Sequence, residues 1–107
     1  MRALEFTPGE KSPVSIDWRH RLLAIDEARG VVSGTTTLSS AAWGVLDGAT
    51  EVTIAGSPAP SIVDSTRAVA WIVAGSSAAG EEAVVSCTAT ISDGSTIPTF
   101  MLIRIGR

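Results

Sequence analysis

Hydrophobic and polar residues alternate along much of the chain, as they do in a β-strand with one buried face. Near the start, Val14, Ile16 and Trp18 fall on one side, and Ser15 and Asp17 fall on the other. The pattern predicts a first strand over residues 14–18 with Trp18 in the core.

A second alternating segment covers residues 50–55, where Val52 and Ile54 share one side. Asp, Gly, Ser and Pro at 47–48 and 56–58 are strong turn signals on either side of it. We therefore expect a strand of about six residues between these turns.

The segment 67–74 places Val69, Trp71 and Val73 on one face, although Ile72 and several alanines make the opposite face less polar than usual. A large aromatic ring in phase with β-branched residues favours core packing. The sequence therefore predicts a third strand with Trp71 in the core.

The C-terminal third carries the strongest strand signal. Apolar and small polar residues alternate over 83–91, Asp93-Gly94 marks a turn, and a second apolar run covers 100–105. Pro98 lies near the start of the second strand, where a missing backbone donor is tolerated. We expect a hairpin here, preceded by a loop at 75–80.

Residues 19–29 do not fit the strand pattern. Leu22, Ile25 and Arg29 are spaced as on a helix, and no Gly or Pro interrupts them. The segment is either about two helical turns, closed by Gly30, or an irregular connection.

Strands at such short spacing, separated by Gly, Pro, Asp and Ser, are typical of an all-β sandwich. A length of 107 residues suits one domain that can bury a core without metals or disulfides. Pro8-Gly9 and Pro13 interrupt the first residues. We expect an N-terminal arm over 1–13 and the sandwich domain over 14–107.

Composition narrows the classes of function. Hydrophobic residues make up 45% of the chain and charged residues only 18%. A net charge of -3, with scattered arginines, lacks the basic patch that nucleic-acid binding requires. We also expect no signal peptide and no membrane-spanning segment, because no apolar run is long enough, and therefore synthesis in the cytoplasm.

Two residues are candidates for catalysis, and both favour a structural role. His20, the single histidine, stands between two arginines, so we interpret it as a surface residue. Cys87, the single cysteine, lies in the middle of an alternating strand and is expected to be buried and unreactive. One cysteine also excludes a disulfide within the chain and a Cys₂His₂ zinc site.

The carboxylates lie mostly in turns and at strand ends, where Asp caps the local backbone. Their spacing matches neither a calcium loop nor the carboxylate pair of a glycosidase. The glycine loop at 75–80 lacks the lysine and helix of a phosphate-binding loop. We therefore expect no enzymatic activity, no cofactor and no metal site.

Trp43 differs from the other two tryptophans. It follows a run of serines and alanines and precedes Gly44 and Val45, so the sequence allows either a core position or a contact surface. An exposed Trp43 beside Ser, Thr and Gly loops would fit a freestanding recognition module of the adhesin or carbohydrate-binding type.

Several motifs follow one another in a distinctive order. They are Ser15-Ile16-Asp17-Trp18, a Ser/Ala-rich stretch ending in Trp43, Val69-Ala70-Trp71, a loop from Gly75 to Gly80, the strand and turn from Val85 to Gly94, and a closing Ile103-Arg104-Ile105. Over residues 11–107 this order resembles a family of small tailed-phage virion proteins, described as fiber-tail adaptors or immunoglobulin-like tail proteins.

The resemblance implies an immunoglobulin-like antiparallel β-sandwich, built in several copies into a virion tail, that links the tail or connector to a fiber or spike. Its partners would be other virion proteins and copies of itself, without nucleic acid or membrane. A low charge density agrees with faces that neighbours cover. The alternatives are a capsid decoration protein and the freestanding recognition module. The protein-contact residues that we expect are Leu4, Phe6, Pro8, Trp43, Asp93, Ser95 and Ile97.

Overall fold

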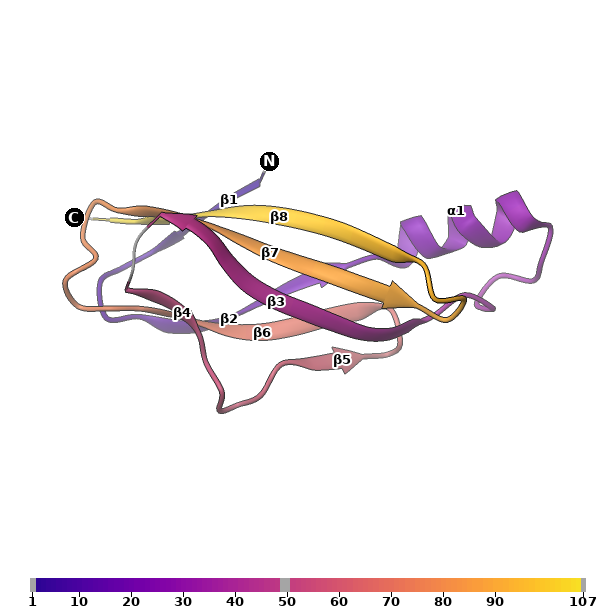
Figure 1. Cartoon of the computed structure of the whole chain (residues 1–107), viewed down its shortest axis with the longest axis horizontal. Coiled ribbons are helices and arrows are strands. Elements are labelled where there is room, and N and C mark those ends of the chain that lie inside the picture. Colours follow the sequence, from indigo (N-terminus) through magenta and orange to yellow (C-terminus); the bar gives the residue numbers. More distant parts are fainter. Residues whose placement is uncertain (1, 49–50, 107) are drawn as a thin grey trace.

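The computed structural model describes residues 2–48 and 51–106, which contain eight strands and one helix (Figure 1). In chain order the elements are β1 (Arg2–Phe6), β2 (Lys11–Asp17), α1 (Arg19–Arg29), β3 (Leu38–Gly48), β4 (Val52–Ile54), β5 (Ser61–Val63), β6 (Arg67–Ala74), β7 (Glu82–Ile91) and β8 (Thr96–Ile105). The molecule is elongated, with principal extents of 50 × 26 × 17 Å, and α1 projects from one end (Figure 1).

The strands form two sheets that pack as a β-sandwich. Sheet A has the order β1-β8-β7-β3, and sheet B has the order β2-β6-β4, with β5 also paired to β6. The orders β8-β7-β3 and β2-β6-β4 correspond to the G-F-C and B-E-D strands of an immunoglobulin sandwich. The pairs are antiparallel, apart from the parallel pair of β1 and β8. The predicted all-β sandwich is confirmed.

Alternation along the strands places one face of each sheet in the core. In β7, every second residue from Ala83 to Ile91 is buried. In β2, Val14 points inward. Trp18, the first residue after this strand, is only 4% exposed. The predicted core position of Trp18 is therefore confirmed.

Strand β6 faces the opposite way from the prediction. Its buried side consists of Ile72 and three alanines, whereas Val69, Trp71 and Val73 lie half-buried on the outer face. The prediction that Trp71 packs in the core is wrong. Small alanine side chains let β6 approach the bulky inner side chains of sheet A, so the space between the sheets decides which face turns inward.

The first residues are part of the sandwich, which differs from the expected arm over 1–13. Strand β1 runs beside β8, with Leu4 opposite Ile103, and Phe6 is buried in the core. Strand β2 begins at Lys11, three residues before the predicted first strand. Strand β1 forms because the open edge of β8 offers hydrogen-bond partners to its backbone. The five residues of β1 alone do not show that these partners exist, so their pattern does not predict the strand.

Residues 19–29 adopt the helical alternative. Gly30 ends α1 in the left-handed conformation, with φ at 70°, and its N–H bonds to the carbonyl of Glu27. At the other end, the Asp17 carboxylate accepts a hydrogen bond of 2.8 Å from the Arg19 N–H. That bond satisfies one of the backbone donors that the first turn of a helix leaves free.

Three strands were not predicted, namely β1, β3 and β5. The expected turn at 47–48 belongs to the end of β3, because pairing with β7 extends that strand as far as Gly48. The expected strand over 50–55 is shorter, from Val52 to Ile54, and Thr50 lies outside the described residues. The loop at 75–80 and the C-terminal hairpin are confirmed, with Pro98 near the start of β8.

Candidate protein-contact sites

The contact residues expected near the N-terminus are integrated into the fold. Leu4 is half-buried against the core, and Phe6 is 5% exposed within it. Pro8 is half-buried in the turn between β1 and β2. Phe6 is therefore a core residue, which leaves only parts of Leu4 and Pro8 for contacts.

The expected residues near the C-terminus are divided between surface and core. Asp93 and Ser95 lie together in the exposed turn between β7 and β8, where the Ser95 N–H donates to the Asp93 carboxylate at 2.8 Å. The same carboxylate forms an ion pair with Arg29 at the end of α1. Ile97 is half-buried and packs against a core cluster. The turn is therefore tied to the helix and presents Asp93 and Ser95 to solvent.

The outer face of sheet A is uncharged over three adjacent strands. Alternate residues of β3, β7 and β8 point away from the core, and all of them are half-buried or exposed. We call this surface the uncharged face. It consists of Ser40, Ala42, Gly44, Ser86, Thr88, Thr90, Thr96, Pro98, Phe100 and Leu102, and it ends at Val84 and the bulge residue Leu46, where the charged residue Asp47 lies opposite Val84.

Two large apolar side chains stand on this face. Phe100 is 44% exposed and Leu46 is 61% exposed. Phe100 pairs with Ser86, which in turn pairs with Gly44, so its ring rises above two small neighbours. An exposed aromatic ring among small residues is a typical anchor in a protein interface.

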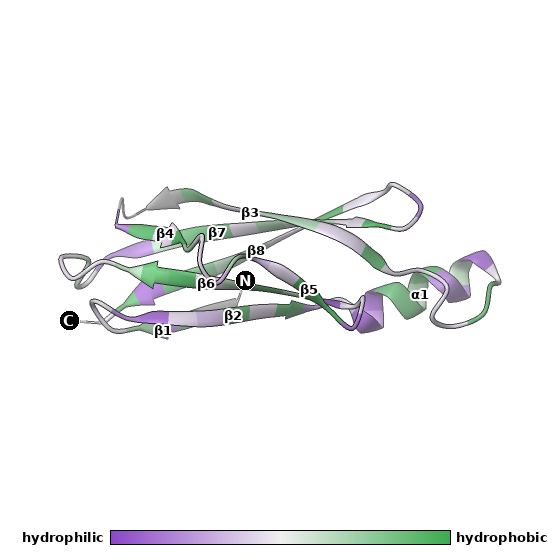
Figure 2. Ribbon diagram, turned by 90° about the horizontal axis from the view of Figure 1, so that it is seen from below, coloured by the Kyte–Doolittle hydropathy of each residue, from purple (hydrophilic) through white to green (hydrophobic). Residues whose placement is uncertain are grey.

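Charged residues lie at the two ends of the uncharged face. At one end, Arg104 Nε donates to Glu82 Oε2 at 2.8 Å. At the other end lies the ion pair of Arg29 and Asp93. In Figure 2 the most hydrophilic segments are likewise on α1 and near the opposite end of the sandwich, while the middle of β3 is pale or green. The face between these two ends carries no charge, and depletion of charged residues is typical of interface cores.

The size of the uncharged face limits what it can hold alone. Strand spacing and rise give it dimensions of about 14 Å by 23 Å, or roughly 300 Å². A standard interface buries about 800 Å² on each partner. A stable partner must therefore also contact the ends of the sandwich, or several copies must each contribute a small contact.

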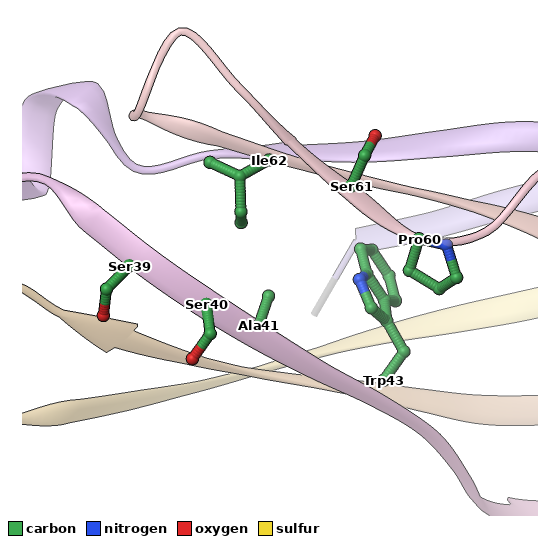
Figure 3. A pocket seen from close by; sticks show the side chains of 7 residues that line it. All are labelled: Ser39, Ser40, Ala41, Trp43, Pro60, Ser61 and Ile62. Atoms are coloured by element: carbon green, nitrogen blue, oxygen red, sulfur yellow. The ribbon is translucent and has the colours of Figure 1, made fainter.

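A second site lies where the two sheets separate, between the edge strands β3 and β5. A cavity of about 250 Å³ opens there, lined by Ser39, Ser40, Ala41, Trp43, Pro60, Ser61 and Ile62 (Figure 3). The half-buried Trp43 ring packs against both core clusters and also lines this cavity. Its Nε1 is buried and has no hydrogen-bond acceptor in the described part of the chain. The sequence left open whether Trp43 lies in the core or on a contact surface. In the structure its ring packs against the core and also lines a surface cavity.

The candidates for catalysis occupy the positions that the sequence predicted. His20 is exposed on α1, and Cys87 is fully buried, where burial raises the pKa of its thiol to about 12. Within residues 2–48 and 51–106, no group of three or more His, Cys, Asp or Glu side chains lies close enough to hold a metal ion. No helix in the same segments is long and apolar enough to cross a membrane.

The sequence pattern does not single out the exposed apolar residues Leu46 and Phe100. Phe100 belongs to an apolar run that predicts a strand, and Leu46 lies in a segment for which no strand is predicted. The signal for this surface is the absence of charge on the outward side of the segments 84–90 and 96–102.

No protein-family model, curated protein or solved structure matches the chain. Its function must therefore be argued from the chemistry of the uncharged face and of the cavity beside β3.

Proposed function

We propose that this chain is a structural assembly domain of a tailed-phage virion, an adaptor that links the tail or connector to a fiber or spike. The observation that carries the proposal is the uncharged face of sheet A, on which Phe100 of β8 and Leu46 near the end of β3 are exposed. Interface cores are depleted in charge and rich in such anchors. The function is therefore to hold neighbouring proteins by surface contacts.

The dimensions of the face support an assembly of several subunits. An area of roughly 300 Å² is too small for a tight two-protein complex, but it suits a contact that is repeated around a ring of copies. The elongated shape, 50 Å along its longest axis, also separates the charged ends of the sandwich. One end can then contact the tail while the other contacts a fiber.

The order of sequence motifs supports the phage setting. Ser15-Ile16-Asp17-Trp18 forms the end of β2 and the start of the turn into α1, and Trp18 fills the core beneath the helix. The motif from Val85 to Gly94 forms most of β7 and its turn. These motifs carry the resemblance to fiber-tail adaptors, and they lie at the end of β2 in sheet B and in the inner strand β7 of sheet A.

A freestanding carbohydrate-binding module has less support. Such modules use exposed aromatic rings as platforms, but Trp18 is buried and both Trp43 and Trp71 are half-buried. The three rings lie on β3, on β6 and directly after β2, so they form no shared platform. A capsid decoration protein would use the same kind of face and differs only in its position in the virion.

Light scattering tests the proposal directly. We expect the chain to form a defined oligomer, or a complex when mixed with the products of the adjacent genes. Phe100→Lys puts an unpaired charge on the uncharged face and should weaken this association about tenfold or more. The fold should persist, because the Phe100 side chain is 44% exposed.

Ser15→Lys provides the matched control, since it adds the same charge to an exposed position on the outer face of sheet B. Association should be unchanged in this variant. A chain that remains monomeric and binds none of those products would contradict the adaptor function. Glycan-array binding that Trp43→Ala abolishes would favour the recognition module.

A further inference from the structure

Strand β3 is the last strand of sheet A, and in the described part of the chain no strand pairs with its outer edge. Only at its start does the Leu38 N–H bond elsewhere, to the carbonyl of Ser65. We call the rest of this side the free edge. The hydrogen-bond pattern of the hairpin shows which residues face that edge. The Ile91 N–H bonds to the carbonyl of Ser95, the turn residue directly before β8 that continues the β7–β8 register. Because such bonds alternate in an antiparallel ladder, the odd residues of β7 bond to β8 and the even residues bond to β3.

The pairing register extends this pattern to β3. Ser40, Ala42 and Gly44 lie opposite the even residues of β7 and therefore bond to that strand. The alternate residues consequently direct their backbone N–H and C=O groups to the free edge. These residues are Ala41, Trp43 and Val45. Backbone groups on an open edge can pair with another strand.

The free edge of β3 lacks the usual features that prevent such pairing. Residues 38–48 contain no Lys and no Pro, and Asp47 is their only charged residue. Bulges occur only near the two ends of the strand, between Leu38 and Ser40 and between Val45 and Asp47. The straight run between them, residues 40–45, is therefore available for regular pairing.

The cavity lies on the inner side of this edge and has the size of a side-chain pocket. At about 250 Å³ it is smaller than the roughly 300 to 1,000 Å³ of small-molecule sites. Figure 3 shows the Trp43 ring rising from β3 toward Pro60, with its nitrogen on the side of Ala41 and Ile62. The buried Nε1–H has no acceptor within the described chain, and buried donors are normally paired.

We propose that the free edge of β3 binds an extended segment of a partner protein as an added strand. A Ser, Thr, Asn or Asp side chain of that segment enters the cavity. A small shift of the Trp43 ring on binding then brings the buried Nε1–H within hydrogen-bond distance of its oxygen. Backbone pairing supplies affinity, and the side-chain pocket supplies specificity. This site shares strand β3 and Ser40 with the uncharged face but uses the free edge and inner side of that strand, and it does not depend on the partner being a virion protein.

The chemistry of the cavity excludes a second copy of β3 as the occupant. Two copies joined edge to edge in one continuous sheet would place inward residues opposite inward residues. The inward side chains of the added copy would be Ala41, Trp43 and Val45, and none of them carries an oxygen. The occupant is therefore a segment of different sequence.

Selection from a displayed library of random linear 12-residue peptides tests the site on the full chain. We expect selected peptides to share an oxygen-bearing residue within an alternating pattern. Trp43→Phe keeps a ring but removes the N–H, and it should weaken peptide binding about three- to tenfold. Ala41→Pro removes one edge donor at a position where an edge strand tolerates proline, and it should weaken binding about tenfold or more.

Amide hydrogen exchange provides a readout that does not depend on the folding of either variant. In the wild-type chain, a bound peptide should slow exchange at Ala41, Trp43 and Val45, and Ser15→Lys should bind peptides as the wild type does. The proposal fails if the library yields no binder, if neither Trp43→Phe nor Ala41→Pro weakens binding, or if protection appears elsewhere. Dimerisation of the chain alone through β3 would overturn the choice of partner.

Discussion

The buried carboxylate of Asp26 organises the loop that joins α1 to β3. It accepts hydrogen bonds of 2.9 Å from the N–H groups of Gly34 and Thr36, and another from the Thr36 hydroxyl. The Thr36 hydroxyl, assisted by backbone N–H groups, holds the pKa of Asp26 below its ordinary value although burial opposes this shift. The carboxylate is therefore ionised in the folded chain at neutral pH.

The lowered pKa of Asp26 predicts a loss of stability in acid. Its contribution to the free energy of unfolding is fully present above the ordinary Asp pKa of about 3.9 and is lost as the pH falls through the lower folded-state pKa. Urea unfolding followed from pH 7 to pH 2 should show this loss. Asp26→Asn should reduce both the stability at pH 7 and the decline below pH 4.

Asp64→Asn is a suitable control for this titration, because Asp64 is exposed in the turn between β5 and β6. Asn also tolerates the positive φ of 54° at that position. If Asp26→Asn keeps the full decline in acid, the hydrogen bonds to Thr36 and Gly34 do not stabilise the loop as argued here.

At the scale of elements, α1 depends on the residue that ends it. Gly30 has a positive φ of 70°, and a Cβ there would meet no atom within 4 Å. Gly30→Ala should therefore cost only the backbone strain, roughly 1 to 2 kcal/mol in the free energy of unfolding. Thermal or urea unfolding measures this cost.

Gly56→Ala separates backbone strain from the general effect of replacing glycine. A Cβ at Gly56 also has open space, but its φ is not in the left-handed region. We expect this variant to be neutral or slightly stabilised, because alanine restricts the unfolded chain. Equal destabilisation of both variants would mean that the conformation of Gly30 is not what ends the helix.

At the scale of the whole molecule, β1 closes the sandwich by pairing with the last strand. Phe6 joins the larger core cluster from this strand and is 5% exposed. Phe6→Ala should lower the free energy of unfolding by about 3 kcal/mol, the low end of the usual cost for a buried aromatic ring. Equilibrium unfolding in urea measures this change.

The neighbouring residue Glu5 is exposed on the same strand, so Glu5→Ala should change stability by no more than about 0.5 kcal/mol. A similar small effect for Phe6→Ala would mean that β1 is a detachable arm. The comparison therefore distinguishes an integral first strand from the arm that the sequence predicted.

The sequence by itself determined the features that depend on neighbouring residues. Alternation identified the strands around 14–18 and 83–91, and it placed Trp18 and Cys87 in the core. For residues 19–29, helical spacing and Gly30 gave a helix as one of two open alternatives, and the structure decided between them. These features follow from side-chain period and local backbone preference, which a short segment contains in full.

Only the tertiary structure decided which segments meet and which faces turn inward. Strand β6 buries its alanines and exposes part of Trp71, because the distance between the sheets limits side-chain volume. The sequence predicted contact residues near the N-terminus, in the turn before β8 and at Trp43, but it could not place Leu46 and Phe100 on one face or Trp43 next to a free edge. Those positions depend on pairing between strands far apart in the chain. The stability of such a pair depends on the side chains and the register of both strands, so neither segment alone predicts it.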